Sequence, residues 1–281
     1  MSLCNMKELL SAVKGTNRAV GSFSVGSMEM VMGAVRAAEE TGTPIILQVA
    51  EVRLPYSPLA LLGPMMVGAA RAARVPVAVH LDHGLTQEVL RQALELGFTS
   101  VMFDGSKLPL EENIRRTKEA AALAASYGAS VEAELGRVGG SEDGTEKNAC
   151  VCTDPAEAER FQQETGVDAL AVAIGNAHGN YRAAPQLRFD VLAQVAARVE
   201  APLVLHGGTG ITPADFQRCA ENGICKINIA TASFDALTAG AARYLKQEGE
   251  AAGFFGLTAA MEQAVYENVL RHIHIFNHES L

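Results

Sequence analysis

The chain has 281 residues, of which 48% are apolar and 20% are charged, a composition typical of a globular protein with a sizeable core. Acidic residues outnumber Lys and Arg by 32 to 23, and no basic stripe is present, which argues against nucleic acid as a partner. No apolar run reaches the roughly 18 residues of a membrane span, and no signal peptide opens the chain, so we expect no membrane partner.

Cysteine usage predicts a reducing compartment. The five cysteines are scattered, and an odd number does not form a disulfide framework. Cys150 and Cys152 flank one valine, but no second Cys or His pair lies near them in the sequence, so we interpret them as ordinary thiols. We therefore expect a cytoplasmic protein.

Eight short apolar runs recur along the chain, and they predict eight strands. Most of the runs are continuous rather than alternating, as in parallel strands that are buried on both faces. The predicted strands cover residues 19–25, 44–50, 75–82, 100–105, 130–136, 169–175, 201–207 and 224–230.

Amphipathic stretches between these runs predict helices. Ser27 and Thr212 stand where N-caps are expected, and Gly128 and Gly223 follow expected C-termini. The predicted helices cover residues 28–40, 86–96, 111–127, 155–165, 189–199 and 213–222. Beyond residue 230 we expect a long helix, a glycine break at residues 253–256 and a final helix to about residue 275.

The repeated strands and helices, without a break in composition, predict one (β/α)8 TIM barrel in which residues 1–281 form a single domain. The alternative, a doubly wound open sheet, lacks a G-x-G-x-x-G sequence after its first strand. Residues 138–152 form an unusually long connection, which predicts a mobile loop after the fifth strand. The extra C-terminal helices can cover the barrel or pair subunits.

Polar residues gather at the expected carboxyl ends of the strands, where TIM barrels have their active sites. His83, His178 and His206 follow the third, sixth and seventh strands. Three imidazoles with an open fourth position are typical of a catalytic zinc site. The other polar residues at these ends are Asp82, Asp104, Glu132, Glu134 and Asn228.

Each of these residues also has a structural explanation. A single His in a loop is more often a hydrogen-bonded structural residue, and only the matching positions of three favour a metal. We interpret His80 as strand packing or support for a neighbour. Asp104 can cap a helix, support a ligand or bind a second cation. We expect His272, His274 and His278 on a surface or a subunit interface.

A glycine-rich turn follows the seventh strand. The backbone N–H groups of Gly207, Gly208 and Thr209 can hold an anion such as phosphate. A turn of this kind alone is often only a turn, and the surrounding polar residues are what favour a binding site.

Six segments together resemble a known family. They are HLDHG at 80–84, EAELG at 132–136, GGSEDG at 139–144, AIGNAHG at 173–179, LHGGTG at 205–210 and KINIAT at 226–231. In order and spacing they resemble the class II, zinc-dependent fructose- and tagatose-bisphosphate aldolases. The resemblance covers about residues 19–231.

The resemblance implies how the metal is held and where the substrate binds. His83, His178 and His206 would hold the catalytic Zn²⁺, and Glu134 with Asp104 would form an alternative or second divalent site. A monovalent cation, Na⁺ or K⁺, would bind near the substrate phosphate. The dihydroxyacetone-phosphate half would contact Gly179, Gly207, Gly208, Thr209, Asn228, Ile229, Ala230 and Thr231.

The resemblance also implies two proton-transfer residues. Asp82 would move the proton on the hydroxyl next to the bond that breaks, and Glu142, on the long loop, would move the proton on carbon. The chemistry needs such a pair, because one carboxylate must take the hydroxyl proton and another must protonate the carbon. A Lewis-acid metal stabilises the charge left beside the carbonyl, and Asn228 can donate to the charged oxygen. Lys226 is the rival for a Schiff-base mechanism, but it lies deeper in the barrel and would leave the three histidines without a purpose.

Two strand ends depart from the family pattern. Ser24 stands where the family usually has Asn, and Ala50 stands where it usually has Ser. The C-terminal segment lacks a basic pattern for a second phosphate, so either Arg53 or Arg182 replaces it or that phosphate is absent. The resemblance thus implies metal-dependent cleavage of a ketose 1-phosphate or 1,6-bisphosphate to dihydroxyacetone phosphate and an aldehyde.

Other functions and partners stay open at this point. A non-catalytic phosphosugar-binding barrel, like the companion subunit of tagatose-bisphosphate aldolases, would have lost metal ligands or the loop acid, which this chain keeps. A metal-dependent sugar-phosphate epimerase or isomerase on the same fold is a second alternative. The partners expected are a phosphorylated sugar and a companion subunit of that kind. Phe254, Phe255 and Phe276 suggest a homodimer or homotetramer.

Overall fold

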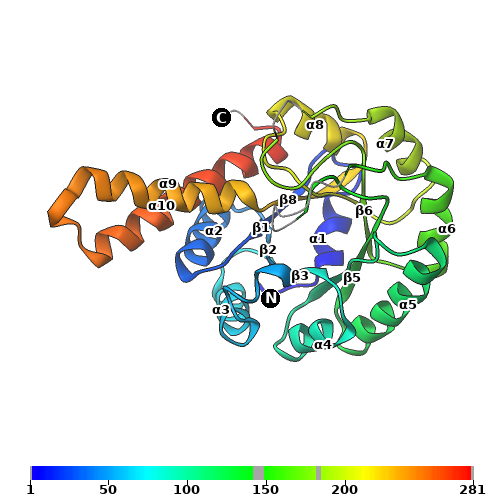
Figure 1. Cartoon of the computed structure of the whole chain (residues 1–281), viewed down its shortest axis with the longest axis horizontal. Coiled ribbons are helices and arrows are strands. Elements are labelled where there is room, and N and C mark those ends of the chain that lie inside the picture. The colour runs from blue at the N-terminus through cyan, green and yellow to red at the C-terminus, as the bar shows by residue number, and fades with distance from the viewer. Residues whose placement is uncertain (1, 142–148, 182–184, 280–281) are drawn as a thin grey trace.

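The computed structural model describes residues 2–141, 149–181 and 185–279. Eight parallel strands close into a barrel in chain order, and the last strand pairs with the first (Figure 1). This arrangement confirms the predicted TIM barrel, and each predicted run overlaps one strand, although β3 extends two residues beyond its predicted end. The strands are β1 (Val20–Ser24), β2 (Ile45–Ala50), β3 (Val77–Gly84), β4 (Ser100–Phe103), β5 (Ser130–Leu135), β6 (Ala169–Val172), β7 (Leu203–Leu205) and β8 (Ile224–Ile229).

Helices surround the barrel, and the six predicted between strands agree with the structure to within a few residues. α1 and α3 were missed by the sequence pattern. α3 is apolar almost throughout and contains Pro64, so it lacks a clear amphipathic period. The helices are α1 (Met6–Val13), α2 (Met28–Thr41), α3 (Leu59–Ala72), α4 (Gln87–Glu95), α5 (Leu110–Ser126), α6 (Pro155–Thr165), α7 (Phe189–Ala196), α8 (Pro213–Glu221), α9 (Thr231–Glu248) and α10 (Phe254–Phe276), with short 3₁₀ turns η1 (Glu51–Arg53) and η2 (Gly249–Ala251).

α1 fills the amino-terminal end of the barrel. Its side chains Met6, Leu9 and Leu10 are buried and contact inward-facing residues of the strands. The Sδ atom of Met6 lies 3.3 Å from Oγ of Ser100. The lower interior is therefore a solid apolar layer, which leaves only the carboxyl ends of the strands open for a site. The strand residues of this layer are Val20, Ile46, Ala78, Ala169, Ala171, Val204 and Cys225.

The C-terminal helices α9 and α10 form a hairpin that projects from one side of the barrel (Figure 1). The predicted glycine break is shorter than expected, because α10 already begins at Phe254. Gly256 lies inside α10, where a Cβ atom would stand 2.0 Å from the Tyr244 hydroxyl, so this glycine lets the two helices approach. Phe254 and Phe255 are 71% and 84% exposed at the turn of the hairpin.

His272 corrects an expectation from the sequence. We expected it on a surface or interface, but α10 packs against α2 and places His272 in the core. Its ring lies 6.1 and 5.8 Å from the rings of Phe216 and Phe276. Burial lowers the pKa of His272 to about 4.

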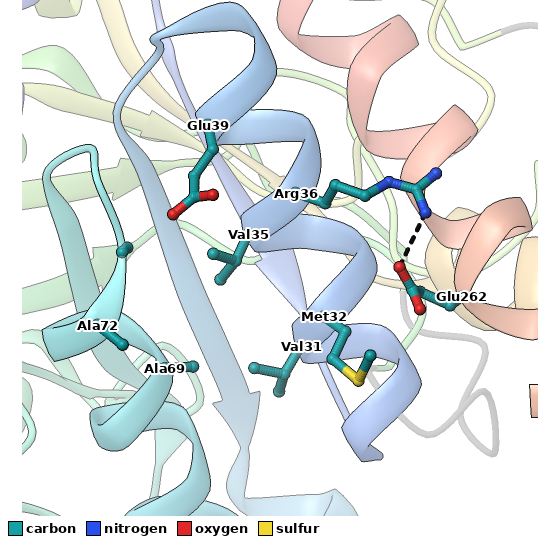
Figure 2. A pocket seen from close by; sticks show the side chains of 9 residues that line it. Val31, Met32, Val35, Arg36, Glu39, Ala69, Ala72 and Glu262 are labelled. Atoms are coloured by element: carbon teal, nitrogen blue, oxygen red, sulfur yellow. Dashed lines mark hydrogen bonds and ion pairs between the residues drawn. The ribbon is translucent and has the colours of Figure 1, made fainter. Parts of the chain in front are cut away.

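A surface groove of about 340 Å³ lies beside α2 and α3 (Figure 2). Val31, Val35 and Ala69 line it, and Arg36 reaches across to Glu262 at 2.9 Å. None of the lining residues stands at the end of a strand, so this groove is separate from the expected active site. Within the described residues, no helix is long and apolar enough to cross a membrane.

Candidate metal centre

Four metal-ligand side chains meet at the carboxyl ends of the strands. His83 lies at the end of β3, Glu134 lies in β5, and His178 and His206 follow β6 and β7. One ligand atom from each lies within 4.8 Å of the other three. The predicted ligands His83, His178, His206 and Glu134 thus come together, whereas Asp104 is outside this cluster.

A β-bulge brings two consecutive residues of β3 to the same site. Along β4, Val101 pairs with Leu81 and Phe103 pairs with Gly84, so β3 has one extra residue between these pairs. His83, within the bulge, has a positive φ of 44°, which is unusual for a residue other than glycine. The bulge lets both Asp82 and His83 face the mouth instead of pointing to opposite sides of the strand.

Asp104 holds the ring of His83. Nδ1 of His83 donates to Oδ2 of Asp104 at 2.8 Å, and this leaves Nε2 as the ring nitrogen that can bind a metal. The backbone N–H of Ser106 donates to the other carboxylate oxygen at 3.0 Å. Burial raises the pKa of Asp104, but these hydrogen bonds outweigh burial and keep it well below the usual range.

His206 is oriented by Glu132 in a similar way. Its Nε2 donates to Oε1 of Glu132 at 2.8 Å, and its Nδ1 lies 3.4 Å from Oε2 of Glu134. Burial lowers the pKa of His206, but the interactions with Glu132 and Glu134 outweigh burial and raise it to about 9.

The cluster fits a divalent metal ion. Nδ1 of His206 and Oε2 of Glu134 are buried, and neither makes a well-formed hydrogen bond with the described residues. Buried polar atoms without partners are costly unless something else binds them. Imidazole nitrogen and carboxylate oxygen are ligands that Zn²⁺ takes in catalytic sites.

A buried ion pair lies below the metal centre. Nζ of Lys226 is 2.9 Å from Oε2 of Glu132, and both side chains are fully buried. Burial raises the pKa of Glu132, but Lys226 and the His206 hydrogen bond outweigh it and lower that pKa. Burial, and then the charge of Lys226, hold the pKa of nearby His80 well below its usual value. His80 contacts Ser100 at 2.7 Å and lies outside the metal cluster, as expected of a supporting residue.

Two amide side chains hold the carboxylate of Asp82. Nε2 of Gln48 donates to Oδ2 at 2.9 Å, and Nδ2 of Asn228 donates to Oδ1 at 3.1 Å. Oδ1 of Asn228 accepts from Nζ of Lys226 at 2.7 Å. Ser24 accepts a second hydrogen bond from Gln48 at 3.0 Å. Asp82 is thus fixed at the inner wall of the mouth.

The loops after β7 and β8 pack closely together. Gly207 has a φ of 65°, and a Cβ atom there would lie 2.1 Å from the Ala177 carbonyl oxygen, so only glycine fits. The N–H of Gly208 donates to the Asn228 carbonyl at 3.2 Å and joins the turn after β7 to the end of β8. Oγ1 of Thr209 accepts from the N–H of Ala232 at 3.0 Å. The predicted phosphate-binding segments, with Gly207–Thr209 in one and Asn228–Thr231 in the other, therefore lie side by side.

A cavity of about 390 Å³ opens beside the metal ligands. His83, Glu134 and His178 line one side of it, and Gly140 and Ser141 line another. The start of the long loop after β5 is held beside the His178 loop, because the N–H of His178 donates to the Gly139 carbonyl at 2.8 Å. Glu142, the predicted loop acid, and Arg182 lie outside the described residues.

Three polar residues of the site were missed by the sequence reasoning. Gln48 lies in β2, whose other residues are apolar. A polar residue within this apolar run was the signal that could have identified it. Asn176 donates to the His206 carbonyl at 2.9 Å, and the Tyr181 hydroxyl donates to the Gly207 carbonyl at 3.0 Å. Both residues tie the loop after β6 to the loop after β7. Nothing in their spacing indicated these contacts.

The barrel and the His-rich centre at the carboxyl ends of its strands define a metal-binding TIM-barrel enzyme. The family model described as fructose-bisphosphate aldolase class-II matches residues 4–280. The chain therefore belongs to the class II fructose-bisphosphate aldolase family, whose members are metal-dependent carbon–carbon lyases.

Individual relatives agree with this assignment. The fructose-bisphosphate aldolase of Staphylococcus aureus (strain Mu50 / ATCC 700699) is 40% identical over 234 residues, which cover 82% of each chain. The probable fructose-bisphosphate aldolase of Bacillus subtilis (strain 168) is 40% identical over 236 residues, with the same coverage. Among solved structures, the YdjI aldolase from Escherichia coli K12 has a TM-score of 0.87 at 36% identity, and the match covers 98% of this chain and 97% of that one.

Proposed function

We propose that this chain catalyses reversible aldol cleavage of a ketose 1-phosphate or a ketose 1,6-bisphosphate of the fructose or tagatose type. The products would be dihydroxyacetone phosphate and an aldehyde, such as glyceraldehyde 3-phosphate. The observation that supports this most directly is the cluster of His83, His178, His206 and Glu134 next to the carboxylate of Asp82.

The metal in this proposal is Zn²⁺, held by His83, His178 and His206. Glu134 is the fourth group of the cluster and would serve an alternative or second divalent position. Asp104 would act there mainly through His83, because it already accepts the Nδ1 hydrogen bond. When bound, the metal supplies Lewis-acid stabilisation of the charge that develops beside the breaking bond. A monovalent cation, Na⁺ or K⁺, would bind near the phosphate.

Asp82 and Glu142 would divide the proton transfers. Asp82 takes the proton from the hydroxyl next to the bond that breaks, and the amides of Gln48 and Asn228 keep its carboxylate in place. Asn228 would also donate to the oxygen that gains charge. Glu142, in the segment that follows β5 in the sequence, would return a proton to carbon.

The phosphate of the dihydroxyacetone half would bind at the paired loops after β7 and β8. Gly179, Gly207, Gly208 and Thr209 approach it from one side. The segment Asn228, Ile229, Ala230 and Thr231 approaches from the other and leads into the amino terminus of α9, where a helix dipole favours an anion.

Two strand ends bear on the aldehyde half of the substrate. Ala50 and Ser24 at the ends of β2 and β1 lack the side chains typical of the family, and Arg53 in η1, which follows β2, can meet a second phosphate. A member of the same family that acts on a sugar or sugar acid with a single phosphate is therefore the alternative substrate class. A non-catalytic phosphosugar-binding subunit is the alternative of another class.

The remaining expectations also stay proposals. We propose that residues 1–281 act as one domain and that the enzyme is a homodimer or homotetramer, with the exposed Phe254 and Phe255 at the interface. A non-catalytic companion subunit is a further proposed partner. A cytoplasmic location is supported by the five cysteines, which are all free thiols.

A direct assay separates these functions. Metal-free protein would be incubated with fructose 1,6-bisphosphate, tagatose 1,6-bisphosphate or fructose 1-phosphate, with zinc or with a chelator, and dihydroxyacetone phosphate would be measured. We expect zinc-dependent release from at least one ketose. Zinc binding without release from any ketose 1-phosphate would contradict the aldolase and favour a binding subunit, whereas an epimerised ketose as product would indicate an epimerase.

A further inference from the structure

We propose that Lys226 is a positioning residue that orients both the proton-transfer residue Asp82 and the metal ligand His206. One ammonium group contacts Oδ1 of Asn228 at 2.7 Å and Oε2 of Glu132 at 2.9 Å. Asn228 leads to Asp82 and Glu132 leads to His206. This inference rests on the proposed aldolase roles of those two end residues.

The first arm runs through Asn228 to Asp82. An ammonium can only donate hydrogen bonds, so Lys226 selects the oxygen of the Asn228 amide and turns its nitrogen toward the carboxylate. That nitrogen donates to Oδ1 of Asp82 at 3.1 Å. Without Lys226, the amide can rotate and present its oxygen to the carboxylate, which would push Asp82 away from the position held by Gln48.

The second arm runs through Glu132 to His206. Lys226 engages one carboxylate oxygen of Glu132, and the other accepts from Nε2 of His206 at 2.8 Å. This hydrogen bond fixes the proton of His206 on Nε2 and leaves Nδ1 for the metal. Nδ1 lies 3.4 Å from Glu134, so the fixed ring faces the other ligands.

The place of Lys226 in the barrel argues against a purely structural role. Both members of the ion pair are fully buried, and the layer immediately below is apolar. A well-packed apolar pair is usually as stable in such a position as a buried ion pair, so stability alone does not explain the charges. The two arms, one through Asn228 and one through Glu132, do explain them. They also explain a lysine that faces the barrel interior without serving as a Schiff base.

The test uses full-length Lys226→Met and the charge-compensated double variant Lys226→Met/Glu132→Gln. Zinc affinity of the metal-free proteins would be measured by competition with a chromophoric chelator. kcat and KM for the best ketose phosphate would be measured at saturating zinc. For Lys226→Met we expect zinc affinity to fall about 10- to 100-fold and kcat to fall about 100-fold, with KM changed less than about twofold.

The double variant separates orientation from charge compensation. The amide that Glu132→Gln introduces carries no uncompensated charge, but it lacks the ammonium that selects which of its atoms faces His206, so we expect zinc affinity to stay about 10-fold below that of the wild type. The thioether that Lys226→Met introduces cannot hold Asn228, so kcat should stay about 100-fold low. Since this variant buries no unpaired charge, it decides the question even if Lys226→Met does not fold.

Several results would overturn the inference. Recovery of kcat in the double variant would contradict the Asp82 arm, and recovery of zinc affinity would contradict the His206 arm. Either recovery would mean that Lys226 only neutralises Glu132. Wild-type zinc affinity and kcat in Lys226→Met would contradict both arms. A wild-type protein that binds zinc without cleaving any ketose phosphate would contradict the proposed function instead, while the zinc titrations would still test the His206 arm.

Discussion

Asp104 accepts a hydrogen bond from Nδ1 of His83 at 2.8 Å and thereby fixes the His83 ring. Of the three imidazoles in the candidate metal centre, this one lies closest to the other two. The ring of His83 is centred 5.0 Å from that of His178 and 4.7 Å from that of His206. A carboxylate in this position can orient a histidine toward a metal without binding the metal itself.

This relationship predicts the effect of changing Asp104. Asp104→Ala should weaken zinc binding about 10- to 100-fold, because His83 loses the group that fixes its ring. Asp104→Asn is the matched control, since its amide oxygen can still accept from Nδ1, and it should stay within a few-fold of the wild type. Competition titrations of the metal-free proteins measure both. Unchanged affinity in Asp104→Ala would contradict the orienting role.

The buried ring of His272 predicts a pH dependence of stability. Burial lowers the pKa of His272 to about 4, below the value of 6.5 of an exposed histidine, while Nδ1 donates to the Asn268 carbonyl at 2.7 Å. The unfolded chain therefore binds more protons between these pH values. The free energy of unfolding should be fully retained above pH 6.5 and fall by roughly 3 kcal/mol as the pH drops to about 4.

Urea unfolding at several pH values tests this contribution. His272→Phe keeps an aromatic ring among Phe23, Phe216 and Phe276 but cannot be protonated, so its stability should change less between about pH 6.5 and about pH 5 than that of the wild type. His278→Gln alters an exposed histidine and should leave the wild-type dependence intact. Equal slopes for His272→Phe and the wild type would refute the assignment.

The proposed role of Glu142 predicts a selective kinetic defect. Glu142→Gln should slow the exchange of the carbon-bound proton of dihydroxyacetone phosphate about 10²- to 10⁴-fold, because the loop would lack its acid and base. Affinity for dihydroxyacetone phosphate should change little. Glu146→Gln, in the same segment of the sequence, is the matched control. An unchanged exchange rate in Glu142→Gln would remove this residue from the mechanism.

The tip of the α9–α10 hairpin predicts self-association. Phe254 and Phe255 are exposed side by side, with ring centres 5.5 Å apart, and exposed aromatic clusters of this kind are typical of interfaces. Sedimentation velocity should show a dimer or tetramer that Phe254→Ser/Phe255→Ser dissociates. Leu61→Ser, at another exposed apolar residue, should not. A monomeric wild-type protein would exclude this interface.

Much of the fold could be predicted because the strands are buried on both faces. Their apolar runs are easily recognised in the sequence, and Gly128 and Gly223 mark the ends of two helices. α3 was not predicted, because an apolar helix that contains Pro64 has no polar face and therefore shows no amphipathic periodicity in the sequence. His272 was misplaced because the sequence does not show which face of the last helix packs on α2.

The clustering of His83, His178 and His206 could be predicted because a barrel brings the ends of all its strands to one edge. The way in which His83 reaches this cluster could not be predicted, since it depends on a bulge and a positive φ that no local pattern encodes. The links from Lys226 to Glu132 and from Asn228 to Asp82 join strands that are distant in sequence. Such contacts depend on barrel register, which single-sequence reasoning does not supply.

Solvent deuterium exchange into dihydroxyacetone phosphate, with zinc and with a chelator, tests the proposed chemistry most directly. It requires no choice of aldehyde, because the proton next to the carbonyl exchanges before any bond to an aldehyde forms. We predict rapid exchange with zinc, loss of exchange with the chelator and recovery when zinc is restored. Absent exchange in protein that holds stoichiometric zinc would contradict aldolase chemistry on dihydroxyacetone phosphate.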